Sequence, residues 1–149
     1  MLRNGDRAGE YFRIINPIEH ARTKDGVLRY KVEPYVVAAD IYASSSMMGR
    51  GGWTWYTGSS SWLYIAGLEN ILGITRHGNM LRINPCIPHN WNGFRVEYLY
   101  EDTKYVIEIK NPDFKSNGLN NIWLDDKLIM TNEIVLKNDK KIHRIEIEF

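Results

Sequence analysis

The stretch that decides the fold is GRGGWTWYTGSSSW, residues 49–62, in which four glycines, three tryptophans and several hydroxyl side chains precede an apolar helical pattern. A glycine-rich loop that leads into a helix presents backbone N–H groups to an anion. Aromatic rings beside it suit flat, partly apolar ligands such as sugar rings. We therefore expect Thr57, Gly58 and Ser59 to bind phosphate. The alternative is a tight turn whose tryptophans belong to the core.

The helix that follows is predicted over residues 59–72, and it is apolar around nearly its whole axis. Such a helix has to be buried on most sides. Gly73 is well placed to cap its C-terminus. Before Gly73 helical signals dominate, and after it strand signals dominate. We therefore predict two parts, residues 1–73 with helices and the glycine-rich loop, and residues 74–149 with strands.

Upstream of the loop the pattern predicts one further helix, over residues 7–15, with Asp6 as its N-cap. Asn16-Pro17 ends it, because the residue before a proline avoids the helical region. Lys24-Asp25-Gly26 is typical of a turn. Residues 32–42 are apolar, and their periodicity is compatible with a buried strand or a buried helix.

Downstream of Gly73, residues 80–83, 94–100, 105–109, 122–124, 127–130, 134–136 and 142–149 have the composition of short strands. Glu101-Asp102 and Asp125-Asp126 form turns between hairpin strands. Short strands at this spacing favour two packed antiparallel sheets. The predicted fold class is therefore α+β, with an antiparallel β-sandwich after the helices.

The overall composition argues against several classes of function. The 149 residues carry a net charge of +1, with no single-sign field that would favour nucleic acid or a membrane surface. No segment reaches the roughly 20 apolar residues of a membrane helix. Cys86 is the only cysteine, so no disulfide can form within the chain. We expect a cytoplasmic protein. The first ten residues resemble the end of one helix and the start of another, which suggests a fragment.

Few titratable residues are arranged as in a catalytic or metal-binding site. Glu33 and Asp40 lie in an apolar setting, either as acid–base or sugar-binding carboxylates or as partners of nearby backbone N–H groups. The four histidines show no metal-ligand spacing, so we expect no metal site. Arg50 is a candidate to meet an anion. The strand tyrosines, which are Tyr98, Tyr100 and Tyr105, are explained by a sugar platform or, more simply, by cross-strand packing.

Four segments in order carry a family resemblance: INPIEH (15–20), YKVEPYVVAADIY (30–42), GRGGWTWYTGS (49–59), and INPCIP (83–88) followed by Trp91. Together they resemble the C-terminal part of glycoside hydrolase family 94, formerly glycosyltransferase family 36. This family includes cellobiose and chitobiose phosphorylases and the phosphorylase-like region of cyclic β-1,2-glucan synthases. The second and third segments look most like the β-1,2-glucan branch.

The resemblance implies the last helices of an (α/α)₆ barrel, then a β-sandwich. It also implies an inverting reaction in which inorganic phosphate, a co-substrate with no further cofactor, attacks a β-glucoside. The family's phosphate-contacting Thr-Gly pair matches Thr57 and Gly58. The family's general-acid aspartate and phosphate-binding histidine have no matching motif here, so no catalytic residue is assigned.

We therefore expect part of an enzyme that acts on β-linked glucose oligosaccharides, inactive as an isolated chain. The substrate-binding candidates are Glu33, Asp40, Arg50 and Trp53. The expected partners are a β-glucan oligosaccharide, phosphate, and the missing N-terminal part of the enzyme or a second copy. The alternative is a non-catalytic module in which the strands bind glycan or support the barrel.

Overall fold

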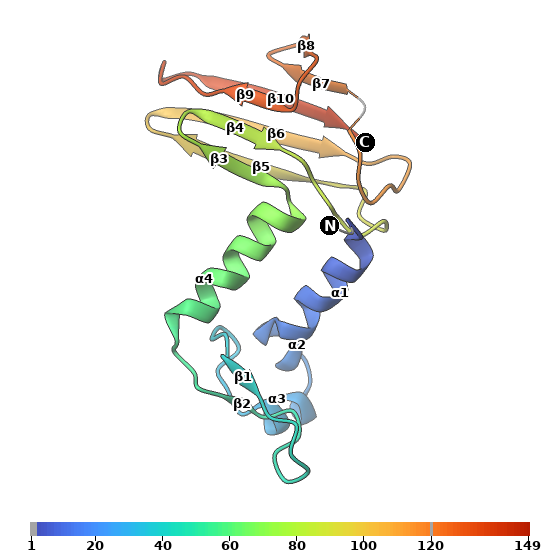
Figure 1. The fold of residues 1–149 in the computed structure, drawn as a ribbon, viewed down its shortest axis with the longest axis vertical. Coiled ribbons are helices and arrows are strands. Elements are labelled where there is room, and N and C mark those ends of the chain that lie inside the picture. The colour runs from blue at the N-terminus through green and yellow to red at the C-terminus, as the bar shows by residue number, and fades with distance from the viewer. Residues whose placement is uncertain (1–2, 120) are drawn as a thin grey trace. The chain divides into compact units, whose positions relative to one another are not determined.

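The computed structural model describes residues 3–119 and 121–149 (Figure 1). The chain divides into two compact units. The sheet unit combines the N-terminal residues up to Ala8 with Leu68–Phe149, and the helical unit is Gly9–Gly67. Helices and strands are thus largely segregated along the chain, which confirms the α+β class. The last helical residue is Ile71, and the strands that follow begin at Ile74.

The sheet unit contains two sheets. In the three-stranded sheet the order is β3 (Ile74–His77), β4 (Met80–Ile83) and β9 (Glu133–Val135). In the five-stranded sheet the order is β5 (Gly93–Tyr100), β6 (Thr103–Lys110), β10 (Ile142–Glu148), β7 (Asn121–Leu124) and β8 (Lys127–Ile129). The predicted strands are present, and β3 is an additional one.

The five-stranded sheet is mixed, which corrects the expectation of purely antiparallel sheets. Strand β10 pairs in parallel with β6, for example Ile145 with Ile107, and antiparallel with β7. Parallel neighbours need a long connection, and here β7, β8 and β9 lie in the chain between β6 and β10. The β7–β8 turn has Asp125 and Asp126 at φ 49° and 65°, the left-handed pair of a two-residue hairpin turn.

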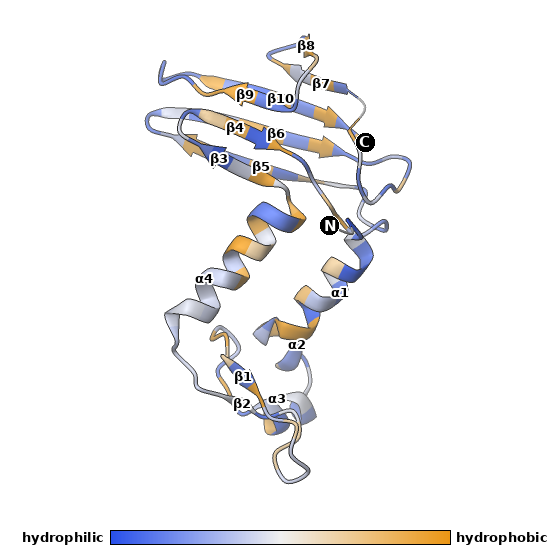
Figure 2. Cartoon of the chain, in the orientation of Figure 1, coloured by the Kyte–Doolittle hydropathy of each residue, from blue (hydrophilic) through white to orange (hydrophobic). Residues whose placement is uncertain are grey.

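The core of the sheet unit comes from alternate residues of its central strands, visible as alternating hydrophobic and hydrophilic positions along β6 and β10 (Figure 2). Fully buried side chains include Leu81, Ile83, Ile107, Ile145 and Ile147. Tyr105, one of the strand tyrosines considered for a sugar platform, is also buried, and its hydroxyl oxygen accepts a hydrogen bond from the Lys137 N–H at 2.8 Å. Cross-strand packing therefore explains this tyrosine better than a sugar platform does.

Helix α1 (Gly5–Ile15) ends before Asn16-Pro17, as predicted, but Asp6 is not its N-cap. Asp6 lies inside the first turn, where its carboxylate accepts hydrogen bonds from the N–H and the ring Nδ1 of His89. Asn4 takes the capping role, because its side-chain oxygen accepts from the Arg7 N–H at 3.0 Å.

The helical unit continues with α2 (Pro17–His20) and α3 (Lys24–Tyr30). The predicted turn at Lys24-Asp25-Gly26 is wrong, because these residues form the first turn of α3. The hydroxyl of Thr23 accepts from the Gly26 N–H and caps this helix. Residues 32–42 are mostly irregular and form neither a buried strand nor a buried helix.

Strands β1 (Asp40–Ile41) and β2 (Gly51–Gly52) form a short antiparallel hairpin before α4 (Thr57–Ile65). Helix α4 continues as a π-helical segment, Ala66–Ile71, and Gly73 follows at φ 71°, the left-handed conformation expected of a C-cap. The predicted burial of this helix is not present among the described residues. Trp62 is 73% exposed and Tyr64 68%, because no other described element of the helical unit covers them. No helix in the described ranges has the length and apolar character needed to cross a membrane.

Candidate functional site

The candidate anion site is the N-terminus of α4. The N-cap residue Tyr56 has an extended backbone, with φ −84° and ψ 109°, and its side chain makes no capping hydrogen bond. The first-turn N–H groups of the helix therefore have no side-chain acceptor, and they add to the positive end of the helix dipole. Thr57 is exposed, so its hydroxyl is accessible to a ligand at this helix end.

Two serine hydroxyls near this helix end, those of Ser59 and Ser61, are already engaged. The hydroxyl of Ser59 donates to the carbonyl oxygens of Tyr56 at 2.8 Å and Val37 at 3.2 Å. The hydroxyl of Ser61 donates to the carbonyl oxygen of Thr57 at 2.9 Å. Ser59 therefore offers an anion its backbone N–H rather than its hydroxyl proton. Within the described residues, the exposed hydroxyls of Thr57 and Ser60 make no hydrogen bond, and Thr57 is the one in the predicted site.

The glycines of the loop serve packing. Gly51 and Gly52 are buried. A Cβ atom on Gly51 would lie 2.6 Å from a methyl group of Val32, and one on Gly52 would lie within 3.0 Å of the Tyr42 ring. A Cβ atom on Gly58 would lie 2.8 Å from the ring of Tyr56. Close packing therefore accounts for Gly51, Gly52 and Gly58 without a ligand.

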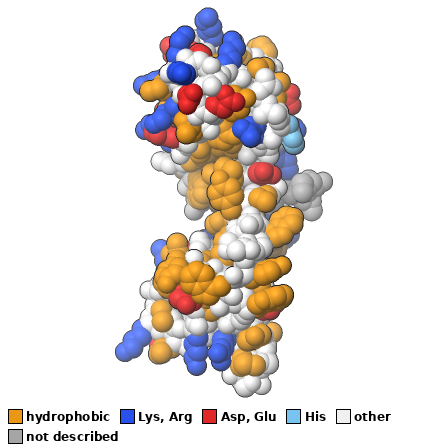
Figure 3. All heavy atoms as spheres, turned by 90° about the vertical axis from the view of Figure 1, so that its left-hand side faces the viewer, with side chains coloured by type: hydrophobic (Ala, Val, Ile, Leu, Met, Phe, Trp, Pro, Cys, Tyr) orange, Lys and Arg blue, Asp and Glu red, His pale blue; other side chains and the backbone are white. Residues whose placement is uncertain are grey.

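The tryptophans are not core residues. Trp53 is 65% and Trp55 68% exposed, and hydrophobic side chains form patches on the molecular surface (Figure 3). The Trp53 ring stacks on Tyr56 with a centroid separation of 4.8 Å, and Trp55 meets Tyr35 edge-on at 6.2 Å. Both tryptophans have left-handed backbones, at φ 48° and 61°. Such residues cost energy and cluster at functional sites, which favours a binding role for this loop.

A hollow of about 660 Å³ is lined by Trp53 and brings it together with two other predicted substrate-binding residues, Glu33 and Arg50. Asp40 does not line it; this exposed residue pairs through its backbone with Gly52 in the β1–β2 hairpin. Sequence reasoning missed Lys31 and Tyr42, which also line the hollow. Both belong to the YKVEPYVVAADIY segment, so the resemblance was the available signal.

The comparisons with known proteins agree with the resemblance. The sequence model described as "Glycosyl hydrolase 94 superfamily, catalytic domain" matches residues 1–73. These residues, about half of the chain, belong to this glycoside hydrolase family.

Individual relatives extend the similarity beyond the matched region. A cyclic β-(1,2)-glucan synthase, NdvB, of Rhizobium meliloti (strain 1021) is 43% identical over 89% of the chain, which corresponds to 4% of that protein. An N,N'-diacetylchitobiose phosphorylase of Vibrio proteolyticus is 34% identical over 83% of the chain and 15% of its own length. A solabiose phosphorylase of Paenibacillus borealis is 26% identical over 78% of the chain, again 15% of its own length. The chain thus spans a small part of each relative.

Proposed function

We propose that the chain is the C-terminal part of an inverting glycoside phosphorylase or glucosyl-transferring enzyme that acts on β-linked glucose oligosaccharides. In that enzyme α1–α4 would be the last helices of an (α/α)₆ barrel, and the two sheets a β-sandwich. The similarity to a cyclic glucan synthase and to phosphorylases supports the reaction class. The large exposure of Trp62 and Tyr64 supports a missing helical layer, which the preceding part of the enzyme would supply.

The observation that carries the proposal is the uncapped N-terminus of α4 beside exposed aromatic rings. Inorganic phosphate would accept hydrogen bonds from the Thr57 hydroxyl and from the N–H groups of Gly58 and Ser59. The hollow with Glu33, Arg50 and Trp53 offers a carboxylate, a guanidinium and an aromatic face to sugar hydroxyls and rings. Phosphate then replaces the water and base of an inverting hydrolase, while the proton donor comes from outside these residues.

Phosphate titration of the ¹⁵N-labelled chain tests the proposal. We expect saturable shifts of the Gly58 and Ser59 amides, and a loss of affinity of about tenfold in Thr57→Val, because one hydrogen bond to a charged ligand is lost. Thr75→Val, in β3 of the sheet unit, is the matched control. The chain alone should form no sugar 1-phosphate from cellobiose or β-1,2-glucan oligomers. Unchanged amides in the first turn of α4, or product formation, would contradict the proposal.

The alternative, a glycan-binding sheet unit, has one observation in its favour. A hollow of about 370 Å³ in this unit is lined by several amide and hydroxyl side chains, Asn84, Asn121, Thr131 and Asn132, beside the highly exposed Met130. This reading predicts saccharide binding that does not depend on phosphate and shifts the amides of these residues. Shifts confined to α4 and its preceding loop would favour the phosphorylase reading.

A further inference from the structure

A second hollow in the helical unit, of about 260 Å³, is lined by three basic side chains, Arg29, Lys31 and Arg50. The side chains of Ser45 and Ser46 line it as well, so that it combines cationic and hydroxyl donors. We call it the basic hollow. None of its lining residues belongs to the first turn of α4, so it is separate from the phosphate site proposed above. It shares Lys31 and Arg50 with the larger hollow, whereas Arg29, Ser45 and Ser46 line the basic hollow alone.

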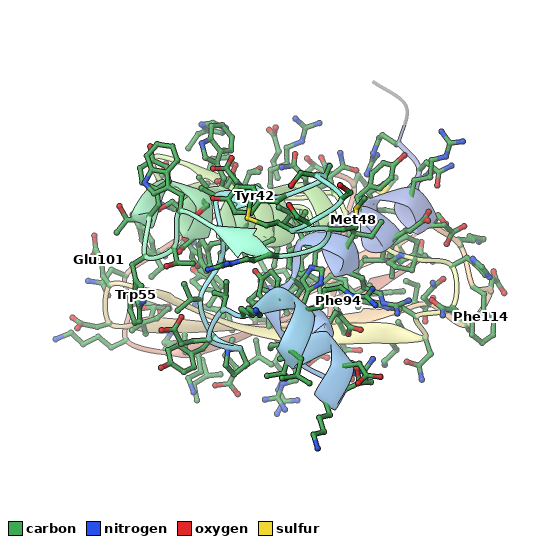
Figure 4. The ribbon with its side chains drawn as sticks, turned by 90° about the horizontal axis from the view of Figure 1, so that it is seen from below. Tyr42, Met48, Trp55, Phe94, Glu101 and Phe114 are labelled. Carbon is green, nitrogen blue, oxygen red and sulfur yellow. The ribbon has the colours of Figure 1, made fainter. Side chains whose placement is uncertain are left out.

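The local fold explains why these residues meet. The β1–β2 hairpin continues beyond its two-residue strands, because the Tyr42 N–H donates to the Arg50 carbonyl at 2.9 Å and the Gly49 N–H donates to the Tyr42 carbonyl at 2.8 Å. Residues 43–48 are therefore the tip of this hairpin, and Tyr42 and Met48 are labelled along it (Figure 4). The tip supplies the two serines, and the returning strand supplies Arg50.

The end of α3 supplies the other two cations. Lys31 is the C-cap residue, held at φ 53° with its N–H donating to the Val27 carbonyl. The aliphatic stem of Arg29 packs against Gly49, where a Cβ atom would lie 2.9 Å from Cδ of the arginine. Gly49 itself has φ 79°, a conformation that glycine adopts without strain. The backbone therefore fixes the positions of the Cα atoms from which the Arg29 and Lys31 side chains extend.

The charges of this hollow are not balanced by the chain. Elsewhere in the helical unit, Arg13 and Arg22 pair with Glu19. Among the residues that the structure describes, Arg29, Lys31 and Arg50 form no ion pair, and no carboxylate lines the basic hollow. Like charges held around one small space repel one another unless an anion joins them. A ligand that suits this space is therefore negatively charged.

We propose that the basic hollow binds an oxyanion of the phosphate class, either free or as the charged end of a small ester. Guanidinium groups match the geometry of phosphate oxygens, and the serine hydroxyls add neutral donors. The volume lies just below the roughly 300 Å³ at which pockets for drug-sized molecules begin, which favours a small ligand over a polymer segment. This inference goes beyond the proposed function; Arg50 borders both hollows, and the test therefore uses Arg29, which lines only the basic hollow.

The test is an NMR titration of the ¹⁵N-labelled chain with inorganic phosphate, sulfate and glucose 1-phosphate, with glucose as the uncharged comparison. We expect saturable shifts of the Ser45 and Ser46 amides with an affinity of about 1 mM, weak because the donors face solvent. Arg29→Gln should weaken this binding about tenfold, and Arg29→Lys less, because it keeps the charge. Tighter binding of glucose 1-phosphate than of phosphate would identify an ester as the ligand, and equal binding would identify the ion itself.

Lys24→Gln is the matched control, since Lys24 is an exposed cation on the same helix that does not line the hollow. It should change the affinity less than twofold. Equal effects of Arg29→Gln and Lys24→Gln, or serine amides that do not respond to any of the three anions, would overturn the proposal. Thr57→Val should leave these shifts intact, which separates this site from the site at α4.

Discussion

One charged cluster in the sheet unit leads to a prediction about stability and pH. The ring of His143 lies between two carboxylates, with Nδ1 2.6 Å from Oδ2 of Asp125 and Nε2 3.2 Å from Oδ1 of Asp139. Its side chain is only 15% exposed and stacks on Tyr105. Because both ring nitrogens face acceptors, only the doubly protonated imidazolium donates to both carboxylates. The cluster joins the β7–β8 turn, the segment before β10, and β10 itself.

The pKa shifts define the pH window of this stabilisation. The hydrogen bond with Asp125, and then that with Asp139, raise the pKa of His143 despite its burial. Burial alone would raise the pKa values of Asp125 and Asp139, but hydrogen bonds with His143 and neighbouring N–H groups outweigh it and lower both. The contribution of His143 to the free energy of unfolding is therefore complete below the ordinary histidine pKa of about 6.5. It is lost as the pH rises through the raised pKa of His143 in the folded protein. The aspartate contributions are lost as pH falls through their lowered pKa values.

We expect His143→Gln to lower the free energy of unfolding by about 1 to 2 kcal/mol at pH 5.5, since hydrogen bonds to charged groups are strong but water screens the partly exposed carboxylates. At pH 9 the cost should shrink, because the wild-type ring has lost its second proton. Urea unfolding, followed by amide signals of β7 and β10, measures both values. His77→Gln, an exposed histidine at the end of β3, is the control. Equal costs at the two pH values, or equal costs for the two histidines, would refute the reasoning.

Two further predictions concern the packing of the sheet unit, and the same urea unfolding measurement checks both. Ile147→Ala should lower the free energy of unfolding by about 3 to 4 kcal/mol, because this fully buried side chain lies between Ile109 and Ile122 on the neighbouring strands. Ile142 is two-thirds exposed on the same strand, and Ile142→Ala should lower it by less than about 1 kcal/mol. Gly93→Ala should cost at least 2 kcal/mol, because Gly93 has φ 141° and a Cβ atom there would collide with the Ile109 carbonyl oxygen; Gly78→Ala, at φ 63° in open space, should cost about 1.

The sequence predicted the strands and turns that depend only on residues close together in the chain. The strand-like composition of residues 105–109 and 142–149 identified β6 and β10, and the Asp125-Asp126 pair identified a hairpin turn. The parallel pairing of β6 with β10 was not predictable, because it depends on a contact between segments more than 30 residues apart. Strand β3 was missed because Ile74 is its only aliphatic residue, whereas the equally short β4 has three apolar residues.

Helix α3 was missed for a different reason. Lys24-Asp25-Gly26 has the composition of a turn, and the decisive residue is Thr23 just before it, whose hydroxyl caps the helix. At the candidate site the sequence named Glu33, Arg50 and Trp53, which share one hollow, but it also named Asp40, which a hairpin backbone pair places elsewhere. Residue type predicted the chemistry, and only the folded loop decided which side chains meet.

The glycine-rich stretch has two parts with different roles: Gly51 and Gly52 are needed for packing, whereas Thr57 is a candidate ligand contact. Variants in the two parts therefore have to be interpreted differently. Gly51 and Gly52 are glycines because the side chains of Val32 and Tyr42 leave no room for a Cβ atom. A substitution there disturbs the hairpin, so a loss of phosphate binding in Gly51→Ala is no evidence of a contact with phosphate. Thr57 is exposed, and its side chain carries no packing duty in the described structure. Its hydroxyl is therefore the group whose removal reports on anion binding alone.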